Sequence, residues 1–157
     1  MEKKYGDDLA IFFVHQPLPF HKNAKPAAIA MQAAAKQGKG WEMHDKMFAN
    51  QQGLTRDGLL NMAKAIGLDL DEFEADLDSD ELKAQVESDQ KLARKVGATG
   101  TPMFFINGVP LSGAQPFKKF VTVIDAELKE ANKLLESGTP IADIYEKRSK
   151  ANVAAGS

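Results

Sequence analysis

Residues 98–116, ATGTPMFFINGVPLSGAQP, hold the turn signals that decide the fold. Proline has no backbone N–H to give to a β-ladder, so Pro102 fits only as the first residue of the apolar run 103–106. Asn107 and Gly108 form the dipeptide typical of a type I′ turn, because both positions of that turn need positive φ. The segment therefore predicts a β-hairpin that opens on an X-Pro bond, a place where the cis isomer is found.

Upstream of the hairpin, the sequence predicts one more strand and a series of helices. Leu9–His15 is a continuous apolar run, typical of a strand that is covered on both faces. Residues from about 23 to 97 show helical periodicity instead. Their cap signals include Thr55 as an N-cap and the pair Asp78 and Glu81 as a capping box. An all-helical insertion thus separates two strand regions.

Downstream of the hairpin, the most regular amphipathic pattern in the chain predicts a long helix. Apolar residues recur at helical spacing from Phe117 to Leu135, and Gly138 supplies a stop signal. Pro140 then restarts a short helix. The last residues, 150–157, are small and polar, and we expect them to fray.

The length, composition and net charge exclude several classes of protein. With 157 residues, 43% hydrophobic and 27% charged, the chain fits a single globular domain. A net charge of -2 with scattered lysines offers no basic stripe for nucleic acid. No apolar run approaches the roughly 20 residues of a membrane span, so we expect neither nucleic acid nor membrane as a partner. The sequence has no cysteine, which excludes disulfides and thiolate nucleophiles.

Three stretches resemble the bacterial DsbA family of thiol:disulfide oxidoreductases: YGDDLAIFFVHQPLPFHKNA (5–24), GKGWEMHDKMFANQ (38–51) and GATGTPMFFINGVPLSGAQP (97–116). The likeness covers about residues 5–135, and GTPMFFING is its most specific piece. It implies an α/β, thioredoxin-like fold that is incomplete, with a DsbA-type helical insertion and about three strands per chain. It also implies that the bond between Thr101 and Pro102 is cis.

The resemblance also implies a division of the chain. We expect a DsbA-like domain over residues 1–138, with its helical insertion at about 23–97. Residues 139–157 would form a C-terminal helix and a frayed tail.

The sequence departs from the family at the residues that carry out the family's redox chemistry. In the family, a strand and a helix with a CxxC pair precede the run that Leu9 opens, and neither is present here. Residues 1–5 followed by Gly6 resemble the last turn and the stop signal of that helix, so we expect a truncated chain. Because attack by a thiolate is the whole of disulfide exchange, we predict that this chain is catalytically inert.

The family's topology places the absent strand in the centre of the sheet, between the strands that 9–15 and 103–106 resemble. Unpaired buried backbone groups cost about 1–3 kcal/mol each, so such a gap must be closed. Three repairs are open: the two edges pair directly, a second copy fills the gap, or the sheet takes a partner's strand. Direct pairing needs the fewest assumptions, and we also expect at least a homodimer formed through sheet completion.

By resemblance, Gly100, Thr101 and Pro102 form the loop that binds protein or peptide substrates; alternatively, the proline only shapes a turn. The three histidines match no common zinc spacing and no cysteine can complete a set, so we predict no metal site and no cofactor. A second candidate, a peptide groove, would be lined by Trp41, Met43, Met47 and Phe48. Their helical spacing favours packing in the core.

Two functions remain open from the sequence. The resemblance implies a thiol:disulfide oxidoreductase that acts on proteins outside the cytoplasm, for example in the periplasm, with this chain inactive by itself. The alternative is a redox-inactive peptide-binding or assembly module that uses the cis-proline loop or an open sheet edge. The reading frame upstream of Met1 distinguishes them, because the enzyme needs a CxxC there.

Overall fold

The computed structural model describes residues 1–155, apart from the side chain of Glu2. The chain forms two compact units. Unit 1 combines residues 1–12 with the chain from Gly100 onward, and unit 2 comprises Phe13–Thr99. No helix in the described residues has both the length and the apolar character to cross a bilayer.

The regular structure of unit 2 is helical, as its periodicity predicts. The elements, in chain order, are α2 (Ala24–Lys36), α3 (Gly40–Ala49), the 3₁₀ turn η2 (Gln51–Gly53), α4 (Arg56–Ala65), α5 (Leu70–Leu77) and α6 (Asp80–Lys95). They pack around one apolar core, which begins at Ala28 and ends at Val86. Its largest fully buried side chains are Met43, Leu59, Phe73 and Val86. The core of this unit is therefore made by helices α2 to α6, together with Leu68 in the connection between α4 and α5.

The caps of these helices follow the sequence closely, with one correction. Thr55 caps α4, since its hydroxyl accepts a hydrogen bond from the Gly58 N–H at 3.2 Å. The predicted capping box at Asp78 is wrong by one residue: Ser79 caps α6 and accepts from the Leu82 N–H at 3.4 Å. Asp78 instead ends α5, where its carboxylate binds a neighbouring arginine.

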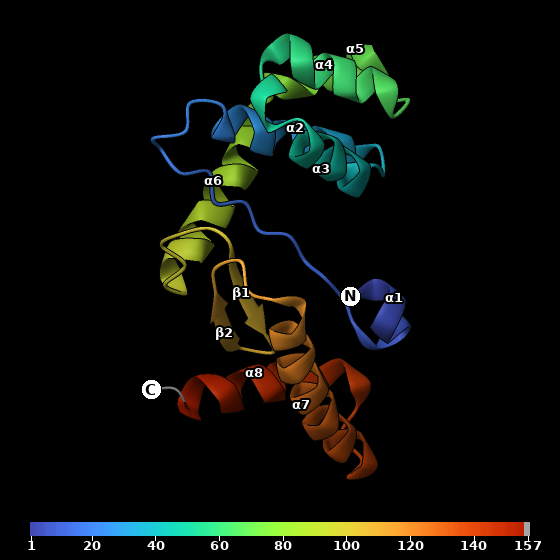
Figure 1. Cartoon of the computed structure of the whole chain (residues 1–157), viewed down its shortest axis with the longest axis vertical. Helices are drawn as coiled ribbons and strands as arrows, with labels where there is room; N and C mark the ends of the chain where they lie inside the picture. Colours follow the sequence, from blue (N-terminus) through green and yellow to red (C-terminus); the bar gives the residue numbers. More distant parts are fainter. Residues whose placement is uncertain (156–157) are drawn as a thin grey trace. The chain divides into compact units, whose positions relative to one another are not determined.

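Unit 1 contains the hairpin and the helices packed on it (Figure 1). Its elements are α1 (Glu2–Tyr5), the 3₁₀ turn η1 (Gly6–Asp8), β1 (Met103–Ile106), β2 (Val109–Ser112), α7 (Phe117–Glu136) and α8 (Ile141–Ala155). The strands are antiparallel, and the turn residues Asn107 and Gly108 have φ of 47° and 87°, as a type I′ turn requires. Helix α7 contacts β1, and α8 contacts both α7 and β2.

Helix α8 is longer than the sequence predicts. It reaches Ala155 and so includes most of the segment expected to fray, while residues 156–157 lie outside the described residues. Two polar contacts hold it. Arg148 donates to both carboxylate oxygens of Glu127 on α7, at 2.9 and 3.0 Å, and Asn152 donates to the Asn107 carbonyl at 2.8 Å. The last helix is thereby fixed to α7 and to the hairpin turn.

The expected third strand does not form, so the sheet of the described chain has two strands rather than three. Residues 9–15 are irregular, and Leu9–Phe12 in unit 1 does not pair with β1. An apolar run becomes a strand only when a neighbour supplies hydrogen-bond partners for its backbone. The direct closure of the two edges, the simplest repair predicted from the sequence, is therefore not the arrangement found.

Candidate functional site

The predicted binding loop, Gly100–Pro102, is exposed in the structure. The Thr101–Pro102 peptide bond is cis. Among the described residues, no hydrogen bond uses the backbone N–H of Gly100 or Thr101. Pro102 is fixed from the other side, because its carbonyl accepts a hydrogen bond from the Gly113 N–H at 2.9 Å. The loop thus has a free backbone on one side and a rigid hairpin on the other.

The bond between Pro102 and Gly113 also sets which backbone groups of the hairpin face outward. In an antiparallel ladder, hydrogen-bonded pairs alternate with pairs whose N–H and C=O groups point away from the partner strand. Phe104 pairs with Leu111 two positions further on, and this pair is hydrogen-bonded by the same alternation. Met103 and Phe105 therefore direct their N–H and C=O groups to the outer edge of β1.

The outer edge of β2 is partly closed by contrast. Pro110 lies there without an N–H, and the Ser112 carbonyl accepts a hydrogen bond from the Gln115 side chain at 2.7 Å. None of the described residues takes the corresponding groups of β1. The edge of β2 thus lacks one donor and has one acceptor occupied, whereas the edge of β1, called the open edge below, has neither feature; the loop Gly100–Pro102 runs directly into the open edge.

One face of β1 packs on helix α7. The rings of Phe104 and Phe120 meet edge to face, with centroids 4.8 Å apart. Phe105, on the opposite face of the strand, has no such ring partner among the described residues and is 40% exposed. The open edge is thus bordered by apolar surface, which suits an extended peptide with apolar side chains.

The residues of the second candidate, the predicted groove, lie on two different faces of α3. They are Trp41, Met43, Met47 and Phe48. Met43 and Met47 are buried in the core of unit 2, as their spacing predicts. For the two aromatic residues the prediction of core packing is wrong: Trp41 is 44% exposed and Phe48 60%. Met43 and Met47 are four residues apart on the buried face of the helix, whereas Trp41 and Phe48 lie on another face.

The outward aromatic residues gather around a histidine. The His44 ring lies 5.2 Å from Trp41, 4.4 Å from Phe48 and 5.4 Å from Phe13, measured between ring centroids. Its Nδ1 is 2.9 Å from a carboxylate oxygen of Asp45. Helical spacing places Trp41, His44 and Phe48 on one face, but it does not reveal their contact with Phe13, which comes from a segment that the sequence assigns to a strand.

His15, beside this cluster, is buried with its pKa lowered. Burial is the main cause, since it disfavours the charged imidazolium, and the nearby Asp89 carboxylate opposes it. Asp89 also accepts a hydrogen bond from the His15 backbone N–H at 3.0 Å. Among the described residues, no group of three or more histidine and carboxylate side chains is arranged to hold a metal ion.

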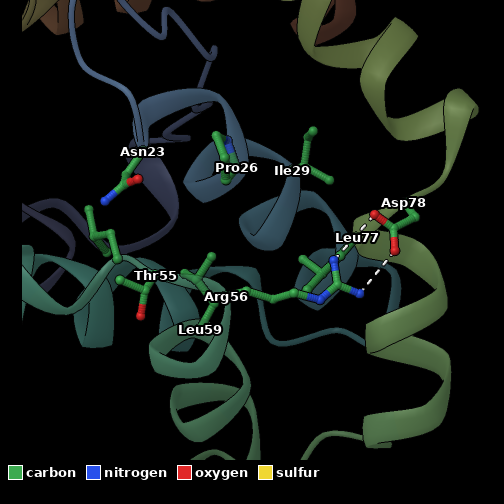
Figure 2. A pocket seen from close by; sticks show the side chains of 9 residues that line it. Asn23, Pro26, Ile29, Thr55, Arg56, Leu59, Leu77 and Asp78 are labelled. Carbon is green, nitrogen blue, oxygen red and sulfur yellow. Dashed lines mark hydrogen bonds and ion pairs between the residues drawn. The ribbon is translucent and has the colours of Figure 1, made fainter.

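A hollow of about 230 Å³ lies in unit 2 between the starts of α2 and α4 and the end of α5 (Figure 2). Its walls are mostly apolar, and Arg56 crosses it to reach Asp78, with contacts of 2.9 and 3.2 Å. The hydrogen bonds from Arg56 lower the pKa of the Asp78 carboxyl group. Both charges are thus paired with each other, so this hollow offers no free group for catalysis.

Comparisons with known proteins agree with the resemblance in the sequence. The profile of a family described as DSBA-like thioredoxin domain matches residues 6–125, a range that includes the loop Gly100–Pro102. This match bears out the α/β, thioredoxin-like fold class with a helical insertion, although the structure shows a two-stranded sheet. No solved structure gives a significant match.

The curated proteins that resemble this chain are named as Na(+)/H(+) antiporters. A Na(+)/H(+) antiporter NhaA of Herminiimonas arsenicoxydans is 39% identical over 122 residues, which are 78% of this chain and 19% of the antiporter. NhaA 3 of Salinispora tropica is 38% identical over 105 residues, 65% of this chain and 16% of that protein. NhaA 1 of Mycolicibacterium vanbaalenii is 33% identical over 125 residues, which are 78% of this chain and 20% of that protein. The chain thus spans about a fifth of the length of these relatives.

Proposed function

The chain belongs to the family of DSBA-like thioredoxin domains, and on that premise we propose that it is the substrate-binding part of a thiol:disulfide oxidoreductase that acts on proteins. The observation that supports this most is the family match across the loop Gly100–Pro102, together with the free backbone N–H groups of Gly100 and Thr101. An extended peptide binds such groups with its own backbone, without regard to its sequence. This suits an enzyme with many protein substrates.

The 157 residues supply binding but no redox chemistry. Disulfide exchange requires a thiolate that attacks one sulfur of a disulfide and expels the other as a new thiolate. The sequence contains no cysteine to provide that thiolate. We therefore propose that this polypeptide is inert in disulfide exchange and that it acts only together with a segment that bears a CxxC pair.

The test combines an assay of chemistry with an assay of binding. Insulin reduction by dithiothreitol should proceed at its uncatalysed rate when the chain is added, and any acceleration would contradict inertness. In an NMR titration of the ¹⁵N-labelled chain with an extended, cysteine-free peptide, the amide signals of Gly100, Thr101 and Met103 should shift. Thr101→Arg should weaken this binding by about tenfold, whereas Thr122→Arg, at an exposed site on α7, should not. Equal effects would contradict the assignment of the loop.

The alternative within the same family is a redox-inactive peptide-binding or assembly module. Both functions predict peptide binding at the loop, so binding does not separate them. The DNA upstream of Met1 does separate them. A reading frame that continues upstream and encodes a β-strand and a helix with a CxxC pair favours the enzyme, whereas an in-frame stop codon favours the module.

The names of the curated relatives support a second candidate function. Each of the three is named as a Na(+)/H(+) antiporter and matches this chain over only 16–20% of its own length. We infer that domains of this kind act as accessory domains of such transporters, where they would bind a protein partner at the loop Gly100–Pro102.

This second candidate is tested in the antiporter of Herminiimonas arsenicoxydans. The matched segment is deleted, or replaced by the present chain, and sodium-driven proton movement is followed in everted membrane vesicles. An accessory role predicts that deletion alters transport or its regulation and that replacement restores it at least in part. Transport that is identical in the intact and the deleted antiporter, at all pH values tried, would contradict the role.

A further inference from the structure

The turn of the hairpin contains a chemically reactive pair of residues. Asn107 is the one asparagine of the sequence that is followed by glycine. The backbone nitrogen of the following residue can attack the side-chain carbonyl carbon of an asparagine, and a glycine leaves that nitrogen unhindered because it has no side chain. Within the described residues, no hydrogen bond occupies the Asn107 side-chain amide or the Gly108 N–H. Neither reacting group is therefore blocked by a partner of its own.

The conformation of the turn keeps these two groups apart. The φ values of 47° at Asn107 and 87° at Gly108 are those of a type I′ turn, which has ψ of about +30° at its first central residue. At this ψ, the Gly108 nitrogen and the Asn107 Cβ lie on opposite sides of the Cα–C bond. Ring closure requires both on the same side, so the peptide between the two residues must first rotate. Whatever holds this peptide therefore controls the reaction.

Helix α8 holds this peptide at two points. The Asn152 side-chain amide donates a hydrogen bond to the Asn107 carbonyl oxygen at 2.8 Å, and that oxygen would have to move in the rotation. The backbone of Ser149 lies against Gly108, so closely that a Cβ on the glycine would be 2.8 Å from the Ser149 carbonyl oxygen. The turn can thus change its conformation only when α8 moves away.

The attachment of α8 depends mainly on polar contacts. Of its described side chains, Ile144 alone is buried, and Ile141 is 80% exposed. Its polar contacts include the pair of Arg148 with Glu127 on α7 and the hydrogen bond from Asn152. Elements with few buried apolar contacts open at a lower free energy than the fold as a whole. We therefore expect α8 to detach while the rest of the chain stays folded.

We propose that Asn107 is a site of spontaneous conversion to aspartate and isoaspartate, and that the detachment of α8 controls its rate. The Gly108 nitrogen loses its proton and forms a bond to the Asn107 Cγ, and the side-chain Nδ2 leaves as ammonia. The product is a five-membered succinimide. Water then adds to one of its two carbonyl carbons, and the bond from that carbon to the Gly108 nitrogen breaks. Breakage at Cγ gives aspartate, and breakage at the main-chain carbonyl carbon gives isoaspartate.

Isoaspartate makes the detachment of α8 permanent. Its main chain runs through Cβ and Cγ, so the turn gains a backbone atom, and the original carbonyl group becomes part of a free carboxylate. The two-residue turn sets the pairing of Ile106 with Val109, which the additional atom disturbs. The acceptor that Asn152 binds is displaced as well. The reaction does not involve the loop Gly100–Pro102, so this proposal is independent of the proposed function.

The rate of conversion is measured in the full chain, incubated at mildly alkaline pH with and without urea. Mass spectrometry of the peptide that contains residue 107 follows deamidation, and methylation by an isoaspartyl methyltransferase with S-adenosylmethionine detects isoaspartate. Asn152→Ala should raise the rate in the folded chain about two- to tenfold, the effect of one lost hydrogen bond on an opening equilibrium. Asn132→Ala, at an exposed asparagine of α7, is the matched control and should leave the rate unchanged.

Urea removes α8 from all three chains, so they should then convert at one rate, faster than the folded wild type. Three results overturn the proposal: a folded wild-type chain that converts as fast as the unfolded one, a folded Asn152→Ala chain that converts at the wild-type rate, or one that does not convert at Asn107. Asn107→Gly also suits a type I′ turn and should abolish the isoaspartate signal; a persistent signal would overturn the assignment of the site. Circular dichroism confirms that each variant is folded.

The permanent detachment of α8 has its own test. Ion exchange separates the converted chain, because a carboxylate has replaced an amide. In limited digestion with trypsin, the isoaspartate form should be cleaved after Lys147 and Lys150 of α8 about tenfold faster than the unconverted chain. Equal rates of cleavage would overturn the link between the conversion and α8.

Discussion

Tyr5 attaches the first helix of unit 1 to α7. Its hydroxyl donates a hydrogen bond to an Asp125 carboxylate oxygen at 2.7 Å and lies 3.4 Å from the Val121 carbonyl. Burial raises the pKa of Tyr5 to about 12, and the hydrogen bond to Asp125 and the charge of that carboxylate act in the same direction. The neutral phenol is therefore the form that the folded chain favours.

This pKa predicts a loss of stability at high pH. The unfolded chain has the ordinary tyrosine pKa of 10.0, so the contribution of Tyr5 is complete below pH 10 and is lost as pH rises through about 12. Spectrophotometric titration should show the ionisation of Tyr5 at about pH 12. Tyr5→Phe should abolish the late step and Tyr145→Phe should keep it. A late step that survives Tyr5→Phe would contradict the assignment.

At the scale of residues, the sequence predicts what depends on local backbone preference. Asn107, Gly108 and the cap at Thr55 follow from the φ values and hydrogen bonds that those positions need. The partnership of Tyr5 and Asp125 has no such signal, because the two residues are 120 positions apart and nothing local links them. The exposure of Trp41 could not be predicted for a related reason. Helical periodicity shows which residues share a face of the helix, but it does not show whether that face is buried.

At the scale of elements, helix α8 lies against the hairpin turn at Gly108. A Cβ at this position would lie 2.8 Å from the Ser149 carbonyl oxygen and 3.0 Å from its Cα. These are backbone atoms of a helix, so they cannot rotate away. Gly108 thus serves the turn, which needs its φ of +87°, and the helix, which needs its lack of a side chain.

Substitution of two glycines separates these requirements. Gly138 has the same φ of +87°, but a Cβ there would meet none of the described residues within 4 Å. Gly138→Ala should therefore cost only the strain of that backbone conformation, about 1 kcal/mol. Gly108→Ala should cost about 2–3 kcal/mol, because α8 must also move. Urea unfolding followed by circular dichroism measures both. Equal losses would show that α8 does not constrain the turn.

The sequence predicts helices better than strands in this chain. A helix satisfies its backbone within itself, so its periodicity and caps are sufficient to identify it. A strand is completed by a neighbour, and only the apolar character of the run Leu9–His15 indicates a strand there. The length of α8 exceeds the prediction because its contacts, Arg148 to Glu127 and Asn152 to Asn107, are tertiary and polar.

At the scale of the whole molecule, the large apolar core belongs to unit 2. The sixteen buried residues of that cluster run from Ala28 to Val86. The buried apolar residues of unit 1 are few and come mainly from different elements: Tyr5, Leu111, Ile124, Ala131 and Ile144. Because stability follows apolar burial, we expect unit 2 to be the more stable of the two.

The aromatic residues allow each unit to be observed separately. Trp41 is the single tryptophan and belongs to unit 2, whereas both tyrosines belong to unit 1. In urea, the tyrosine signal should change at a lower concentration than the fluorescence of Trp41. A fragment of residues 13–99 should retain the Trp41 transition. Coincident transitions in the full chain, or an unfolded fragment, would mean that the units depend on each other for stability.

The candidate site can be predicted only as far as the family resemblance reaches. Gly100–Pro102 is identified because the motif around it is specific, and the profile match covers it. An open sheet edge can be named as an expectation, but which edge of the hairpin is open, with Pro110 closing the other side, depends on the register of the two strands. The similarity to segments of antiporters is found only by comparison with known proteins.

The contact between α8 and Gly108 also has an evolutionary consequence. Helix α8 lies beyond the residues that match the family profile, yet it touches a turn inside them. In homologues without such a helix, asparagine or aspartate can replace glycine in the turn, because their side chains meet no obstacle and tolerate positive φ. A residue with a side chain at this position should therefore be found only in homologues that lack such a helix.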